Sequence, residues 1–176
     1  MKTKLNQSKL KLAIVSAFAL GSASLSTAGY AATTFDNMII LTDVAMSCTV
    51  DAAQLNFSTY DPTSGTPNDA SAVITSSCTH GGSAKITLNQ GAVPAAGSTD
   101  SVPLRQMLNS TDATTLAYSL YQNSDRNIVW GNTAETGLGF TATGGDDTST
   151  VYGRIANGLV ASVGSYADSL SVTLSY

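Results

Sequence analysis

Basic and catalytic side chains are scarce in this 176-residue sequence. It contains eight Lys and Arg residues against twelve Asp and Glu, and a single histidine, His80. Four of the eight cations lie in the first eleven residues, so the rest of the chain has four cations, twelve acids and a net charge of about −8. This acidic balance argues against nucleic acid as a partner, because phosphate binding requires a basic footprint.

Signatures of catalysis and metal binding are also missing. Serine and aspartate are plentiful, but no G-x-S-x-G elbow accompanies His80, which lies in a turn-like stretch. Asp146 and Asp147 follow two glycines without the D-x-[DN]-x-[DN]-G pattern of a calcium loop, and there is no phosphate-binding glycine motif or CxxC pair. We therefore expect a protein that is not an enzyme and that uses no cofactor or metal.

Helical periodicity is absent, and short runs of residues alternate instead between apolar and polar with period two. These runs occupy residues 54–58, 85–89, 116–121 and 166–176. Segments rich in turn-forming residues separate them, at residues 61–68, 91–103, 131–137 and 144–147. Many short strands with frequent turns predict an all-β antiparallel sandwich, and the length fits one domain.

The start of the chain has the layout of a secretory signal peptide. Basic residues between Lys2 and Lys11 precede an apolar run at residues 12–20, and small residues near Ala31 offer cleavage sites. The apolar run is much shorter than the ~20 residues of a membrane-spanning helix. We expect residues 1–31 to be removed and the mature chain to be exported without stable membrane insertion.

Cys48 and Cys78 are the only cysteines in the chain. An even pair in an exported protein predicts one disulfide, and a metal site would need more ligands than the nearby His80 supplies. In the chain-entropy model, closing a loop of about 30 residues contributes about 3.6 kcal/mol of stability. The sequence therefore predicts a domain stapled by one disulfide.

Residues 33–50 form an extended, strongly apolar stretch. Its part near Cys48 is expected to be the first strand of the domain, which leaves residues 33–41 upstream. A chain terminus this apolar must be covered by something. Period two divides its side chains between two faces. Phe35, Asn37, Ile39 and Leu41 share one face, and Met38 and Ile40 lie on the other.

Five short motifs follow one another in the second half of the chain. They are LRQM at residues 104–107, LAYSLY at 116–121, WG at 130–131, YGRI at 152–155 and GSYAD at 164–168. Together with the signal peptide and the terminal strand, this ordered set resembles the spore coat protein U domain family, which includes subunits of Csu-type archaic chaperone–usher pili. The two cysteines also lie where that family places its disulfide. Residues 131–150 are too loop-like to match it strand by strand.

The resemblance implies an incomplete immunoglobulin-like (pilin-type) β-sandwich that lacks its last strand. A periplasmic chaperone would lend a strand first, and at an outer-membrane usher the N-terminal extension of the next subunit would replace it. Residues 32–43 would then be the donor-strand extension and residues 44–176 the domain. The terminal strand would border the acceptor groove with Tyr166, Leu170, Val172, Leu174 and Tyr176. Either face of residues 33–41 fits this role, because a one-residue shift exchanges the two.

The function expected from this resemblance is that of a structural subunit of an extracellular pilus, linked to other copies or related subunits and serving adhesion and biofilm formation. A secreted spore or cell-surface coat protein of the same family is one alternative. An extracellular carbohydrate-binding module is another, because aromatic residues could form a sugar-binding face, although core packing is their commoner use. These residues are Tyr118, Tyr121, Trp130, Tyr152, Tyr166 and Tyr176.

Overall fold

The computed structural model describes residues 31–176, and the predicted signal peptide lies outside the described residues except for Ala31. Residues 42–176 form one compact unit, and residues 31–41 are described separately. The described part of the chain has no helix of the length and hydropathy needed to cross a membrane. It also contains no cluster of side chains suited to holding a metal ion.

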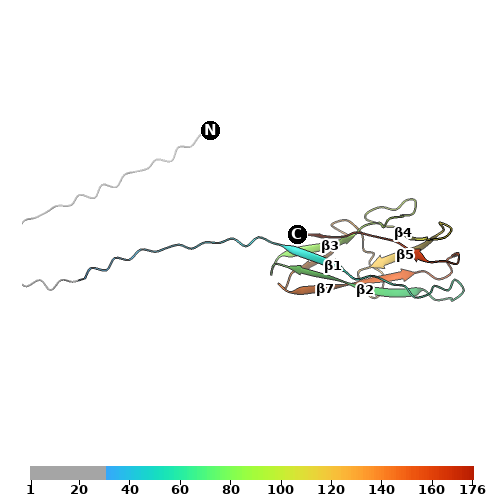
Figure 1. Cartoon of the computed structure of the whole chain (residues 1–176), viewed down its shortest axis with the longest axis horizontal. Coiled ribbons are helices and arrows are strands. Elements are labelled where there is room, and N and C mark those ends of the chain that lie inside the picture. Colours follow the sequence, from blue (N-terminus) through green and yellow to red (C-terminus); the bar gives the residue numbers. More distant parts are fainter. Residues whose placement is uncertain (1–30) are drawn as a thin grey trace, which may run out of the picture. The chain divides into compact units, whose positions relative to one another are not determined.

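Nine antiparallel strands build the compact unit in two sheets. They are β1 (Cys48–Ala52), β2 (Asn68–Cys78), β3 (Ser83–Leu88), β4 (Arg105–Asn109), β5 (Thr115–Tyr121), β6 (Leu138–Thr141), β7 (Asp146–Ile155), β8 (Tyr166–Ala167) and β9 (Val172–Ser175). The larger sheet has the order β1-β2-β7-β5-β4-β8, and the smaller one has the order β6-β3-β9. The all-β fold class predicted from the sequence is confirmed. Figure 1 shows β2 and β7 running side by side along the domain.

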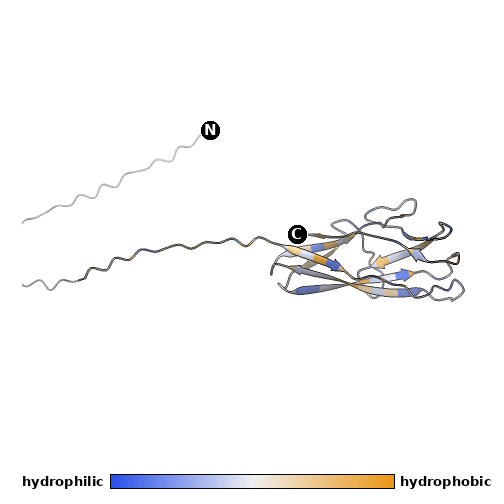
Figure 2. Ribbon diagram, in the orientation of Figure 1, coloured by the Kyte–Doolittle hydropathy of each residue, from blue (hydrophilic) through white to orange (hydrophobic). Residues whose placement is uncertain are grey.

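The longest ladder in the fold joins β2 to β7, from the pair Asn68↔Ile155 to the pair Ser77↔Asp146. Side chains along both strands alternate between the core and the outer face. In β2, the buried side chains are those of Ile74, Ser76 and Cys78. Figure 2 shows polar and apolar residues interspersed along these strands, as expected when one face of a sheet is buried.

The expectation that residues 131–150 are loop-like is wrong, because β6 and the first half of β7 lie there. This stretch is rich in Ser, Thr and Gly and shows little apolar alternation. Its strands form through tertiary pairing with β3 and β2, which overrides weak local propensity. The connecting turn uses Gly144 at a φ of 87°, and the Thr143 N–H donates to the Asp147 carboxylate at 3.0 Å.

The core lies between the two sheets, and Trp130 is at its centre with no exposed surface. Its indole N–H donates to the Ile86 carbonyl at 3.0 Å, so the burial leaves no indole donor unpaired. The predicted alternation holds in β5 and largely in β3, where the inward residues are buried but Thr87 is buried as well. The inward residues are Ile86, Leu88, Leu116, Tyr118 and Leu120. Trp130 and Tyr118 therefore serve the core.

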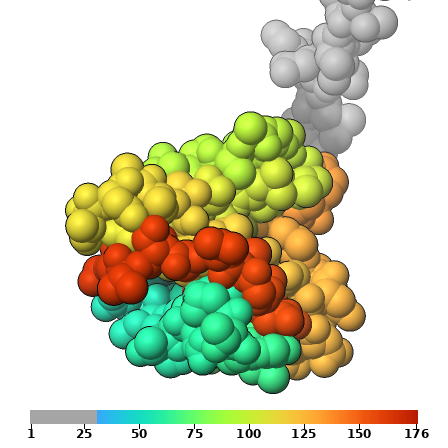
Figure 3. Space-filling model, turned by 90° about the vertical axis from the view of Figure 1, so that its right-hand side faces the viewer, coloured from blue at the N-terminus to red at the C-terminus, as the bar shows by residue number. Residues whose placement is uncertain are grey.

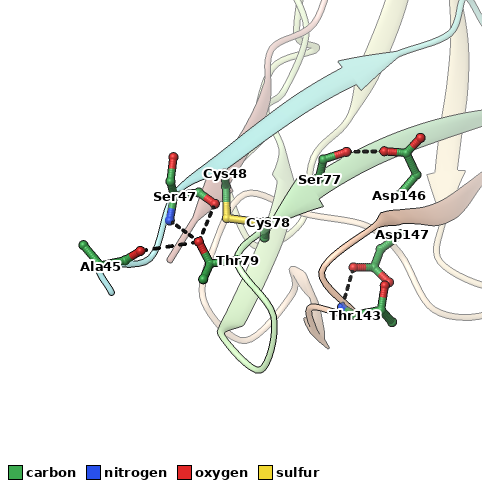
Figure 4. The surroundings of a disulfide bond; sticks show 9 residues. All are labelled: Ala45, Ser47, Cys48, Ser77, Cys78, Thr79, Thr143, Asp146 and Asp147. Carbon is green, nitrogen blue, oxygen red and sulfur yellow. Dashed lines mark hydrogen bonds between the residues drawn. A yellow bond between two sulfur atoms is a disulfide. The ribbon is translucent and has the colours of Figure 1, made fainter. Parts of the chain in front are cut away.

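Cys48 and Cys78 form a disulfide between directly opposed positions of β1 and β2, as the sequence predicts. Figure 4 shows the polar contacts beside it. The Ser47 backbone N–H donates to the Thr79 hydroxyl at 3.1 Å. The Thr79 backbone N–H donates to the Ser47 carbonyl at 3.0 Å. The disulfide and these bonds tie the start of β1 to the end of β2.

The single strand expected over residues 166–176 is instead split between the sheets. β8 pairs with β4 in the larger sheet, and β9 pairs with β3 in the smaller one. The crossing is held by Asn89, whose side-chain oxygen accepts from the Ser171 N–H at 2.9 Å while its own N–H donates to the Ser171 carbonyl at 3.2 Å. The end of the chain thereby passes from the larger sheet to the smaller one.

Candidate strand-acceptor groove

A groove of about 950 Å³ opens into the core between residues 52–62, which follow β1, and residues 161–172, which lead into β9. Figure 3 shows both walls at one end of the domain, in teal and in red. The floor is apolar and comes from strands of both sheets. It includes Ile74, Leu88, Leu116, Leu120, Val151 and Ile155. The groove is open to solvent, so apolar side chains of its floor can be reached from outside the domain.

Part of the first wall has an unpaired backbone. Ala53 donates to the Val73 carbonyl at 3.0 Å, but within residues 31–176 no backbone–backbone hydrogen bond involves residues 54–57. The strand predicted at residues 54–58 is therefore not formed. Its alternation is nevertheless correct, because Leu55 and Phe57 pack against the core while Gln54 and Asn56 are exposed.

The second wall ends in β9, an edge strand of the smaller sheet. One side of β9 pairs with β3, and its other side has no strand partner among the described residues. The residues that the sequence assigned to this wall are distributed along it. Tyr166, Leu170 and Val172 line the groove, whereas Leu174 packs against the core beyond it and Tyr176 is 62 % exposed.

A hydrogen-bonded pair belongs to the polar part of the groove lining, which also includes Gln54, Asn56 and several serines. The Tyr118 hydroxyl donates to the Asp168 carboxylate at 2.6 Å, and the backbone N–H groups of Ala92 and Ser169 donate to the other oxygen of that carboxylate, each at 2.8 Å. Burial, followed by the Asp168 contact, raises the pKa of Tyr118 far above its usual value. Tyr118 thus stays protonated and holds Asp168 in place. The Phe57 ring meets the Tyr118 ring edge-on, with 6.2 Å between the ring centres.

A buried arginine supports this end of the groove from beneath. Arg105 is 1 % exposed and donates to the carbonyls of Leu88, Asn89 and Trp130 at 2.8 to 2.9 Å. Burial lowers its pKa to about 10, an effect that Tyr118 and Asp168 partly offset, so the guanidinium is charged at neutral pH. Sequence reasoning did not single out this network. The available signal was Asp168, the one charged residue on the otherwise apolar face of residues 166–176.

Residues 31–47 contain no strand, so the extended stretch predicted from residue 33 forms a ladder only from Cys48 onward. The apolar side chains of residues 33–41 are exposed on both faces. Their exposed fractions are 91 % for Phe35, 85 % for Met38, 80 % for Ile39, 84 % for Ile40 and 86 % for Leu41. Asn37 is exposed as well. Continuous apolar exposure of this kind is uncommon on the surface of soluble proteins.

The aromatic residues considered for a sugar-binding face do not gather at the surface. Tyr118 and Trp130 are buried, and Tyr121, Tyr152 and Tyr166 are half-buried. Tyr152 is covered on one side by the Arg126 guanidinium, 5.7 Å from the ring centre. Only Tyr176 of the six is more than half exposed, which provides no stacking platform.

The fold has a counterpart among solved structures. The chain is similar to one in the crystal structure of the CsuC–CsuE chaperone–tip adhesion subunit pre-assembly complex from archaic chaperone–usher Csu pili of Acinetobacter baumannii, with a TM-score of 0.55 and 20 % identity. The similarity covers 76 % of this chain and 40 % of that chain, and it concerns the fold.

Sequence comparison identifies the family. Residues 34–173 match the Spore Coat Protein U domain. "Protein U" of Myxococcus xanthus is 35 % identical over 178 residues, which cover 95 % of this chain and 98 % of that protein. The chain belongs to the Spore Coat Protein U domain family.

Proposed function

We propose that this chain is an exported structural subunit of an extracellular pilus, assembled by donor-strand complementation. The observation that carries the proposal is the apolar groove of about 950 Å³ between two walls with unpaired backbone. An added strand would supply backbone partners to residues 54–57 and to the free edge of β9, and its alternate side chains would fill the void. This is recognition by β-augmentation.

Residues 33–41 of another copy or of a related subunit are the proposed occupant. An extended segment of nine residues spans about 30 Å, which is comparable with the first wall. Its exposed apolar side chains would each contribute about 1.5–3 kcal/mol on burial. Residues 32–43 thus serve as the donor-strand extension, and each junction joins one subunit to the next.

Before assembly, a periplasmic chaperone would occupy the groove, and an outer-membrane usher would catalyse the exchange for the next subunit. Two observations support this route: the fold is shared with a chain of a chaperone–subunit complex, and the first 31 residues have the layout of a signal peptide. The finished fibre would stand on the cell surface and serve adhesion and biofilm formation. The role is structural and needs no cofactor.

A second candidate is a coat protein that assembles on a spore or cell surface. The relative named Protein U, 35 % identical over nearly the whole chain, favours it. Gold-labelled antibodies separate the two candidates under the electron microscope. Label along thin fibres supports a pilus, whereas label spread evenly over a coat layer supports the alternative.

The decisive variant lacks residues 33–41 and is co-expressed with its chaperone. We expect a folded, chaperone-bound domain that forms no fibres, because it has a groove but no donor. A double substitution of exposed apolar residues outside the groove, Val102→Ser with Ile128→Ser, is the control and should leave fibres intact. Fibres formed by the truncated chain would exclude these residues as the donor.

A further inference from the structure

Asp168 is the one charged side chain that lines the groove within the described residues. Its carboxylate accepts three hydrogen bonds, from the Tyr118 hydroxyl and two backbone N–H groups, and a carboxylate has about four acceptor sites. The carboxylate can therefore accept one more hydrogen bond, and Asp168 is only half-buried while the groove is empty. A strand that fills the groove would cover this carboxylate further, so the strand should bring a donor of its own.

The donor segment offers one suitable side chain in the right surroundings. On the face that carries Phe35, Ile39 and Leu41, Asn37 is the only polar residue between the apolar ones, since Thr33 lies at the start of the segment, and the Asn37 amide group has two N–H donors. The opposite face carries Met38 and Ile40 but also Asp36. Inserting that face would bring the Asp36 carboxylate into the same apolar groove as Asp168, as an unpaired like charge.

We propose that Asn37 of one copy donates to Asp168 in the groove of the next and so sets the register of the donor strand. This inference rests on the proposed function of the groove. It selects the face with Phe35, Ile39 and Leu41 for insertion and leaves Asp36 in solvent. A shift by two residues would place an apolar side chain against Asp168 and would leave both polar groups unpaired. A buried Asn fixes the register of coiled coils by the same logic.

The test uses the full mature chain with its chaperone, and it compares fibre yield among donor variants. Asn37→Asp places a second carboxylate beside Asp168 and is expected to lower the yield about a hundredfold, because two close like charges cannot both stay ionised without a large penalty. Met38→Asp puts the same charge on the outward face and should assemble within about threefold of the wild type. Equal loss for both variants, or no loss for Asn37→Asp, would overturn the proposal.

Rescue identifies the partner of Asn37. Adding Asp168→Asn to Asn37→Asp restores one amide and one carboxylate, so fibre yield should return to within about tenfold of the wild type. A yield as low as that of Asn37→Asp alone contradicts the pairing. Circular dichroism of the Asp168→Asn single variant verifies its folding, and if it does not fold, donor variants with Asp168 unchanged replace the rescue. Asn37→Ser keeps a hydroxyl donor and should give more fibres than Asn37→Val, which has none; equal yields from the two variants overturn the assignment.

Failure of this inference is distinguishable from failure of the proposed function. If wild-type fibres form and are lost on deletion of residues 33–41 but are indifferent to Asn37→Asp, only the register is wrong. If the deletion variant still forms fibres, residues 33–41 are not the donor, and both proposals fall.

Discussion

The β2–β7 ladder and the first wall of the groove carry the same kind of sequence but differ in structure. In β2, an alternating pattern is paired on both sides, by β1 and by β7. Residues 54–57 alternate just as clearly, yet they have no backbone partner within the described residues. The comparison shows that alternation determines where side chains point, whereas a strand forms only when another backbone satisfies its N–H and C=O groups.

The disulfide connects these two regions, and its loss should have the largest effect. It closes a separation of 30 residues between β1, from which the groove wall continues, and β2. Replacing Cys48 and Cys78 by serine should lower the free energy of unfolding by about 3.6 kcal/mol. Urea unfolding measures this change, and the wild type under reducing conditions serves as the control. A loss below about 1 kcal/mol would contradict the expected role.

Truncation within the paired region should cost nearly as much. Ile74 in β2 is 2 % exposed and belongs to the main core cluster. Ile74→Ala should lower the free energy of unfolding by about 3 kcal/mol, because it removes buried methyl groups and leaves a cavity. The same urea titration measures it, with Val73→Ala on the outer face of β2 as the matched control. Equal losses for the two variants would show that this face of β2 is not buried.

The corresponding change in the groove should separate stability from assembly. Leu55 is half-buried in a wall that lacks a backbone partner. Leu55→Ala should cost only about 1 kcal/mol in the unassembled domain, because the side chain is already partly in contact with water. In the assembled fibre the same residue is expected to be covered, so heating fibres should show a lower dissociation temperature. Unchanged fibres would argue that this wall does not receive the donor strand.

The smallest effect concerns the surface ion pairs beside the ladder. Asp69 accepts two hydrogen bonds from Arg154 at 2.7 Å and lies 3.3 Å from Arg126. The bond from Arg154, aided by the charges of both arginines, holds the pKa of Asp69 below its usual 3.8. The stabilisation is present above that value and is lost as the pH falls through the lowered folded-state pKa. Asp69→Asn should lower the free energy of unfolding by about 0.5–1 kcal/mol at neutral pH and should leave it unchanged at a pH where Asp69 is protonated. Thermal unfolding measured over a series of pH values checks this.

Much of this fold could be predicted from local patterns, and the exceptions share a cause. The alternation in β3 and β5, the Cys48–Cys78 bridge and the apolar extension are all visible in the sequence. The start of β7 was missed because its Ser- and Thr-rich residues become a strand only against β2. The split between β8 and β9 depends on hydrogen bonds that the side-chain oxygens of Asn89 and Asp168 accept from distant backbone N–H groups, which no local pattern reveals. The groove exists because two backbone segments have no neighbouring strand. It can therefore be recognised only once the positions of both sheets are known.

Hydrogen exchange of the two compared regions tests the central claim most directly. Amide exchange would be followed by mass spectrometry in the chain without residues 33–41, before and after addition of a peptide with the sequence of residues 32–43. We predict slow exchange in β2 and β7 throughout, and fast exchange in residues 54–57 that slows when the peptide binds. Residues 54–57 that are as protected as β2 without peptide, or that stay fast at saturating peptide, would contradict an open strand-acceptor groove.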